Sequence, residues 1–113
     1  MGTENDATDD VLKISGRRDG TTVVIVLAGE LDLHGARLLD AEVRRLLDDA
    51  VRSLEIDGGD LEFVDSSGLR SMMQARAEAE AVGASFRLSA VSPAVARVIE
   101  IAGLTGLLLS TGT

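Results

Sequence analysis

Residues 22–28 read Thr-Val-Val-Ile-Val-Leu-Ala, an unbroken run of mostly β-branched residues that decides the fold of this chain. A continuous apolar run of this length is typical of a central strand covered on both faces. Upstream, residues 11–15 have the pattern of a short strand with one buried face. Residues 16–20 begin and end with glycine, which indicates a turn between the two strands. We therefore predict an N-terminal β-hairpin.

Amphipathic helices are predicted at three places after the hairpin. In residues 34–50, apolar residues follow Leu39 at spacings of 4, 7, 8 and 11, which place them on one helical face. Residues 69–83 have a similar apolar pattern and end at a glycine. The Ser-Pro pair at residues 92–93 suits the N-cap and first position of a third helix, and Gly103 suits its end.

Strands alternate with these helices along the chain. Short apolar segments predict them at residues 54–56, 86–88 and 107–109, the first of which ends at Gly58-Gly59. The order after the hairpin is then β-α-β-α-β-α-β, which implies parallel strands joined by right-handed helical crossovers. The predicted fold class is α/β, a single domain over residues 11–113 with a mixed four- to five-stranded sheet and three or four helices.

Charge and composition limit the possible partners. The chain of 113 residues has 19 acidic residues against 11 lysines and arginines, a formal net charge of -8, whereas a phosphate-binding face needs the opposite sign. Phe63 and Phe86 are its only aromatic residues, too few to stack on single-stranded nucleic acid. Cysteine is absent, which excludes disulfides and thiolate metal sites. We expect no direct contact with nucleic acid and a surface that suits a basic protein partner.

The first residues and the hydropathy of the chain bear on its location. Residues 1–10 carry four acidic side chains and no basic one, so we expect a flexible acidic tail there. This segment has no apolar centre and therefore does not resemble a secretory signal. No apolar run approaches the ~20 residues that a membrane span needs. We expect a cytoplasmic protein without membrane contact.

The candidate functional residues lie where the C-terminal ends of parallel strands meet, the edge at which such folds place function. Two loops are predicted there, at residues 29–32 and 58–68. In the second loop, Asp65 or Ser66 can cap the unpaired amides of the next helix, which carry partial positive charge. A phosphate on Ser66 would place an anion at this helix end, with Arg70 one turn further on. Capping with no further role is the alternative.

Other chemistries have less support in the residues. Ser66 lacks the Gly-x-Ser-x-Gly setting of a hydrolase nucleophile, and the only histidine, His34, begins a helix, where the dipole disfavours its cation. The glycines at residues 58–59 and 103–106 are not followed by Lys-Ser/Thr, so a P-loop is not supported, and a small nucleotide-binding protein is kept only as an alternative. Four acidic residues within nine positions are expected to be solvated rather than to bind Mg²⁺: Asp57, Asp60, Glu62 and Asp65.

Three segments together resemble the STAS domain family, and more closely the bacterial anti-sigma factor antagonists. They are residues 29–32 (Gly-Glu-Leu-Asp), residues 63–69 (Phe-Val-Asp-Ser-Ser-Gly-Leu) and residues 92–98 (Ser-Pro-Ala-Val-Ala-Arg-Val), followed by Gly103-Leu104. One such motif is weak, but three in this order and spacing are a strong signal. The resemblance covers roughly residues 11–109 and implies the STAS fold in a regulatory binding module that is not an enzyme.

The resemblance also implies a mechanism. The unphosphorylated antagonist binds an anti-sigma factor that is a serine kinase, and this binding frees the sigma factor. The kinase then phosphorylates the serine that follows Asp65, and the complex dissociates until a phosphatase resets the switch. By position the acceptor is Ser66, with Ser67 as the fallback. The antagonist itself needs no cofactor, because ATP and Mg²⁺ belong to the kinase. The implied partner-binding residues are Asp32, Asp65, Ser66, Ser67, Gly68 and Arg70.

Two further expectations follow from the resemblance. STAS domains also occur in anion transporters, stress-signalling assemblies and lipid-transport complexes, so the alternative function is a kinase-independent scaffold subunit in which Ser66 is only a cap. Family members usually continue past Gly103-Leu104 into a further helix, whereas only residues 105–113 follow here. We therefore expect exposed apolar surface near the C-terminus and a tendency to form a homodimer.

Overall fold

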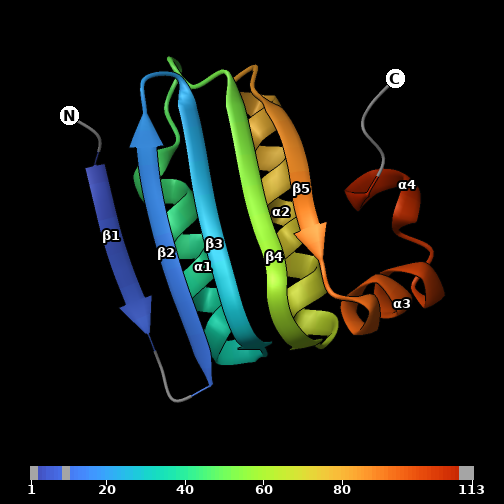
Figure 1. The fold of residues 1–113 in the computed structure, drawn as a ribbon. Coiled ribbons are helices and arrows are strands. Elements are labelled where there is room, and N and C mark those ends of the chain that lie inside the picture. The colour runs from blue at the N-terminus through green and yellow to red at the C-terminus, as the bar shows by residue number, and fades with distance from the viewer. Residues whose placement is uncertain (1–2, 9–10, 110–113) are drawn as a thin grey trace.

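The apolar run at residues 22–28 lies in the middle of a mixed sheet. The computed structural model describes residues 3–8 and 11–109. Within them the five strands are β1 (Thr3–Thr8), β2 (Leu12–Asp19), β3 (Thr22–Leu31), β4 (Ser53–Val64) and β5 (Ser85–Val91), and they lie in this order across the sheet. β2 and β3 form the predicted antiparallel hairpin, whereas β3, β4 and β5 are parallel (Figure 1).

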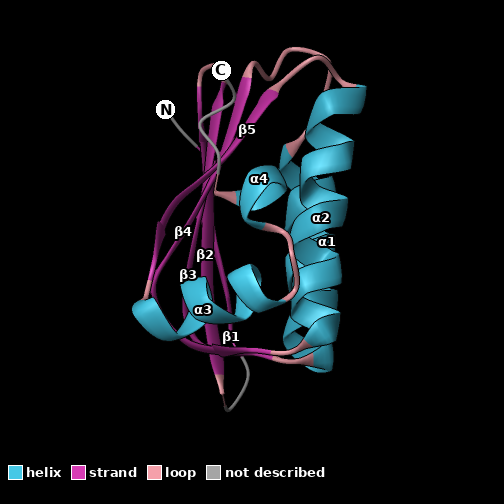
Figure 2. Cartoon of the chain, turned by 90° about the vertical axis from the view of Figure 1, so that its right-hand side faces the viewer, coloured by secondary structure: helices cyan, strands magenta, loops and turns pink. Residues whose placement is uncertain are grey.

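The helices of the described residues are α1 (Leu33–Leu46), α2 (Ser66–Ala81), α3 (Pro93–Ile101) and α4 (Thr105–Leu108). α1 and α2 lie side by side on one face of the sheet, and α3 and α4 lie on the β5 side of it (Figures 1 and 2). None of these described helices is long and apolar enough to cross a membrane. The hairpin followed by helices that alternate with parallel strands confirms the predicted α/β fold.

The hydrophobic core fills the space between the sheet and the two long helices. Ile25 of β3 and Ile56 of β4 are fully buried on this face, and they share one cluster with Leu39 of α1 and Met72 of α2. Ile99 adds the contribution of α3 to the same cluster. Apolar residues at helical spacing on one side and at alternate positions of the strands on the other therefore meet in one layer.

The prediction that the run at residues 22–28 is covered on both faces is wrong. Val26 is 40% exposed on the face of the sheet opposite α1 and α2, whereas its neighbours Ile25 and Leu27 are fully buried. Figure 2 shows both long helices on the same side of the strands. β-branched side chains favour extended backbone even where one face is open, so such a run indicates a strand without indicating two covered faces.

α1 ends at Leu46, before the predicted end at residue 50. The Arg18 guanidinium of β2 donates to the Asp48 carboxylate at 2.6 Å, and Asp48 Oδ1 accepts the N–H of Ala50 at 2.8 Å. These bonds, that from Arg18 foremost, lower the pKa of the Asp48 carboxyl. They also hold the chain after Leu46 in a turn, because an aspartate that bonds its own downstream amide competes with the helix.

Gly58-Gly59 was predicted to end a strand, but β4 continues through this pair to Val64. The register shifts there, since Val26 and Ala28 of β3 face Asp57 and Asp60 of β4, which leaves one extra residue in β4. This is a β-bulge, and glycine inside a strand is a usual mark of one. The predicted loop at residues 58–68 is therefore much shorter, and the strand carries its end to the helix that follows.

Two other predicted boundaries differ. β2 runs on to Asp19, so the hairpin turn is tighter than residues 16–20. Residues 107–109 were predicted as a strand, whereas residues 105–108 form the one-turn helix α4. Its Leu108 is buried in the core while Leu107 is 41% exposed, and Ile101 at the end of α3 is 73% exposed. The apolar surface expected near the C-terminus is thus present in part.

The N-terminal segment also differs from its prediction. Residues 1–10 were expected to be a tail, but Thr3–Thr8 form β1, antiparallel to β2 with Glu4 opposite Arg17. The edge of β2 offers a row of unpaired backbone groups, and backbone pairing requires no apolar side chain. The rest of the predicted tail, residues 1–2 and 9–10, lies outside the described residues.

Candidate functional site

The parallel strands β3 and β4 each lead into a helix through the same kind of cap. Asp32 is the N-cap of α1, and its Oδ1 accepts the N–H of Gly35 at 2.9 Å. Asp65 is the N-cap of α2, and its Oδ1 accepts the N–H of Gly68 at 2.9 Å. Both segments thus have the pattern Asp-x-x-Gly, and each carboxylate satisfies one of the amides that a helix start leaves unpaired.

The two caps lie next to each other at one edge of the sheet. Leu31 and Val64, the last residues of the two strands, are register partners, and the N–H of Asp65 donates to the carbonyl of Leu31 at 3.3 Å. Gly68 packs against this point so closely that a Cβ there would lie 2.6 Å from Leu31 O and 2.6 Å from Val64 Cγ2. Glycine at residue 68 therefore allows α2 to start beside the end of β3.

Ser66 is the first residue of α2, and its side chain is exposed. Its hydroxyl forms no hydrogen bond with any residue that the structure describes. The cap oxygen belongs to Asp65 instead, which decides between the two capping residues that the sequence left open. The Ser66 hydroxyl stands at the positive end of a helix without a structural role there.

Exposed apolar and acidic side chains lie at the same edge of the sheet as Ser66. Leu33, the first residue of α1, holds the position that Ser66 holds in α2 and is 55% exposed. Phe63 near the end of β4 is 46% exposed and faces the exposed Glu30 in the register of the sheet. We call the following six residues the cap edge: Glu30, Asp32, Leu33, Phe63, Asp65 and Ser66.

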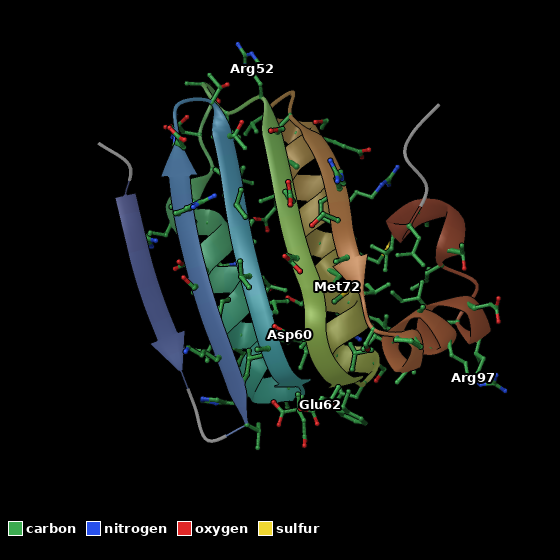
Figure 3. The ribbon with its side chains drawn as sticks, viewed as in Figure 1. Arg52, Asp60, Glu62, Met72 and Arg97 are labelled. Carbon is green, nitrogen blue, oxygen red and sulfur yellow. The ribbon has the colours of Figure 1, made fainter. Side chains whose placement is uncertain are left out.

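The acidic residues of β4 add to the charge near the cap edge. Glu62 is exposed next to Phe63, and Figure 3 shows it at the end of β4, with Asp60 further back along the strand. Asp57 accepts the N–H of Gly59 at 3.0 Å within the bulge, and Asp65 is occupied as a cap. In the described part of the chain, no three acidic or histidine side chains gather as metal ligands.

Two of the predicted site residues belong to a neighbouring feature. Ser67 is half-buried and Arg70 is exposed, and both line a groove between α1 and α2. The sequence predicted that Arg70 would approach a phosphate on Ser66; the structure brings Arg70 together with Ser67 in this groove, and Ser66 is not among the residues that line it. His34 is the second residue of α1.

Sequence reasoning missed the apolar part of the cap edge and the other side of the groove. Leu33 was not singled out, and Phe63 was named only as part of the segment at residues 63–69, because single apolar residues at an element boundary have no periodic signal. The repeated Asp-x-x-Gly at residues 32–35 and 65–68 is a signal that could have found Leu33, since it aligns Leu33 with Ser66. Arg37 and Arg44, which line the groove from α1, are visible only once the two helices are side by side.

Comparison with known proteins agrees with this geometry. The sequence matches the family described as "Mlab, STAS domain" over residues 4–110. The anti-sigma factor antagonist SpoIIAA in its unphosphorylated form is similar in structure, with 27% identity, a TM-score of 0.67 and coverage of 97% of this chain and 90% of that one. The Bacillus cell fate determinant SpoIIAA in its phosphorylated form has 26% identity, a TM-score of 0.63 and coverage of 97% and 93%.

A mycobacterial structure shares the fold at lower identity. An anti-sigma factor antagonist from Mycobacterium paratuberculosis has 24% identity and a TM-score of 0.68, with coverage of 99% of this chain and 88% of that one. These likenesses extend over nearly the whole chain, so the sheet, the four helices and the cap edge all lie within the shared region.

Proposed function

Because the chain belongs to the STAS domain family, we propose that it is an anti-sigma factor antagonist whose cap edge binds an anti-sigma factor serine kinase and whose Ser66 accepts a phosphate from it. The observation that carries the proposal is the placement of Ser66: an exposed hydroxyl at the first position of α2, with the cap bond supplied by Asp65. SpoIIAA, at 27% and 26% identity, has been solved in unphosphorylated and phosphorylated forms, which supports the same chemistry here.

The transfer would use groups from both proteins. The Ser66 Oγ forms a bond to the γ-phosphorus of ATP, the bond from that phosphorus to the β–γ bridging oxygen breaks, and ADP leaves. The hydroxyl proton passes to a base of the kinase, which also supplies Mg²⁺. This chain would hold the Ser66 hydroxyl in place for the kinase. Asp65 and Gly68 fix the start of α2, so the hydroxyl lies on a rigid element.

The phosphate would switch binding through charge. It adds about -1.5 to -2 charge at a helix N-terminus, which stabilises it in place. The same group would join Asp32, Asp65 and Glu30 in the cap edge, so a partner surface that matches the unphosphorylated cap edge would have to desolvate one more uncompensated anion. Such a charge costs several kcal/mol in an interface, more than the roughly 1.4 kcal/mol that weakens Kd tenfold. A phosphatase that removes the phosphate restores binding.

Affinity capture with two variants tests the proposal. Ser66→Ala keeps the cap edge neutral at residue 66, and Ser66→Asp adds a charge, so each is used as bait in a lysate of source cells. We expect Ser66→Ala to retain a kinase that also binds a sigma factor, and Ser66→Asp to bind the purified kinase at least tenfold more weakly by calorimetry. Equal affinities of the two variants would contradict the charge switch.

Mass spectrometry of the unmodified chain after incubation with that kinase, ATP and Mg²⁺ then locates the phosphate. We expect one phosphate on Ser66, none in Ser66→Ala, and an unchanged yield in the control Ser67→Ala. A phosphate that persists in Ser66→Ala at a residue other than Ser67 would contradict the assignment. Capture of a transporter ATPase by both baits, with no kinase, would instead favour the kinase-independent scaffold subunit.

A further inference from the structure

The groove between α1 and α2 has a volume of about 400 Å³ and is partly open to solvent. Its floor is made by Ala36 and Ser71, which are buried and small, so the helices pack closely while leaving a trough above them. Its walls run from Leu33 to Arg44 on α1 and from Ser67 to Glu78 on α2. At a rise of about 1.5 Å per residue, each wall is roughly 16 Å long, or three helical turns.

The charged side chains that line the groove differ in whether they form hydrogen bonds. Asp40 accepts a hydrogen bond from Ser71 Oγ at 2.7 Å, and Glu78 accepts one from Gln74 Nε2 at 3.0 Å. The three arginines that line the groove are exposed, and none forms an ion pair or hydrogen bond with the described residues: Arg37, Arg44 and Arg70.

This lack of partners stands out against the rest of α1. Arg45, adjacent to Arg44, donates two hydrogen bonds to Glu42 at 3.0 and 2.9 Å. In a chain of net charge -8, acidic partners are abundant, yet the groove gathers three cations that use none of them. The groove therefore has three arginines against two carboxylates, a small excess of positive charge in an acidic chain, and the positive groups are the ones without a partner among the described residues.

We propose that this groove binds an acidic α-helical segment of a partner protein. Arg37 and Arg44 are seven residues apart, two turns or about 10 Å along α1. Carboxylates at positions i and i+7 of a bound helix have the same separation on one face, which allows both to meet an arginine. The lining suits a small ligand less well, because small-molecule sites are lined mainly by apolar and aromatic side chains, whereas two of the ten residues that line this groove are apolar, Leu33 and Ala36.

The test uses peptides and the full chain, with no kinase, so its result does not depend on phosphorylation of Ser66. A phage-displayed library of helix-stabilised 16-residue peptides is selected on the immobilised chain. We expect the enriched peptides to carry Asp or Glu at positions i and i+7. We also expect the double variant Arg37→Glu/Arg44→Glu to bind them at least tenfold more weakly by fluorescence anisotropy.

A matched control separates the groove from overall charge. Lys13→Glu/Arg97→Glu changes the net charge by the same amount at two exposed residues outside the groove, and Figure 3 shows Arg97 on α3. This control should keep the affinity. A peptide whose two acids are replaced by arginine should regain binding to Arg37→Glu/Arg44→Glu, which shows that the variant is folded. No enriched peptide, enrichment without the acidic pair, or equal loss in the control would overturn the proposal.

Discussion

At the start of α2, neighbouring residues have separate roles. Asp65 holds the helix through its bond to the N–H of Gly68, and Ser66 makes no bond that the fold requires. A residue that is modified and released repeatedly should not also be the cap, because each cycle would then disturb the helix end. The geometry meets this requirement by placing the cap at Asp65, one residue before the proposed acceptor Ser66.

Because the cap and the hydroxyl belong to different residues, substitutions of Asp65 and Ser66 should have unequal effects on stability. Asp65→Ala should lower the free energy of unfolding by about 1 kcal/mol, the usual cost of losing an N-cap side chain, and Ser66→Ala should change it by less than about 0.5 kcal/mol, as for other exposed positions. Urea denaturation measures both, and Asp32→Ala serves as the matched control for the cap of α1. If Ser66→Ala costs as much as Asp65→Ala, the hydroxyl has a capping role after all.

The sequence could identify Ser66 as a candidate, but it could not show which residue caps α2 or which residues share a groove. Aspartate and serine both cap helices, so the order Asp-Ser-Ser-Gly leaves the identity of the cap open until the N–H of Gly68 is seen to face Asp65. Arg70 was predicted to approach a phosphate on Ser66 from its spacing of four residues, and this stays a prediction. That spacing could not show that Arg70 and Ser67 also line a groove beside α1.

Between elements, Ser71 joins the two long helices. It is 3% exposed, and its Oγ lies 2.7 Å from Asp40 Oδ1 and 3.1 Å from Ala36 O, both on α1. A buried hydroxyl with a charged acceptor is one of the stronger polar contacts available in a helix interface. This contact links α1 to α2 at a residue that lines the groove.

Removal of this hydroxyl has a testable cost. Ser71→Ala should lower the free energy of unfolding by about 1–3 kcal/mol, because Asp40 and Ala36 lose their shared donor. Ser67→Ala, on the same helix and groove but without a hydrogen bond to the described residues, should be within about 0.5 kcal/mol of the unmodified chain. Thermal and urea unfolding measure the difference, and indistinguishable variants would show that Ser71 does not hold the helices together.

Element types were easier to predict than element ends. The periodicity of α1 and the Ser-Pro start of α3 depend on local spacing, and both were predicted. The end of α1 depends on Arg18, 30 residues away from Asp48 in the chain, and the length of β4 depends on pairing with β3 across a bulge. Such long-range contacts override local signals, and glycine alone does not tell a strand end from a bulge.

For the molecule as a whole, the proposed switch changes charge without changing shape. The structures of SpoIIAA in its two phosphorylation states match this chain with TM-scores of 0.67 and 0.63 over 97% of its residues. Here the core lies between the sheet and the helices, and the Ser66 side chain is exposed outside it. The proposed phosphorylation would add charge to a surface that is already acidic, in a chain of net charge -8.

We therefore predict that the phosphorylated chain keeps its fold. In ¹H–¹⁵N NMR spectra, the chemical shifts that change on phosphorylation should be confined to the cap edge and the first turns of α1 and α2. The amides of core strand residues such as Ile25 and Ile56 should stay in place. The non-phosphorylated Ser66→Ala chain, treated with the same kinase, is the control. Changes spread across the sheet would mean that the switch acts through a conformational change.

The tight packing at Gly68 has an evolutionary consequence. Any side chain there would press on the carbonyl of Leu31 and on Val64, so descendants of this protein that keep α2 beside β3 should retain glycine. Residue 66 is under no such structural constraint, since its hydroxyl supports nothing in the fold. If Ser66 is the phosphate acceptor that we propose, a lineage can lose the switch by one substitution at this residue and still inherit an intact domain, which can then serve as a subunit of another complex.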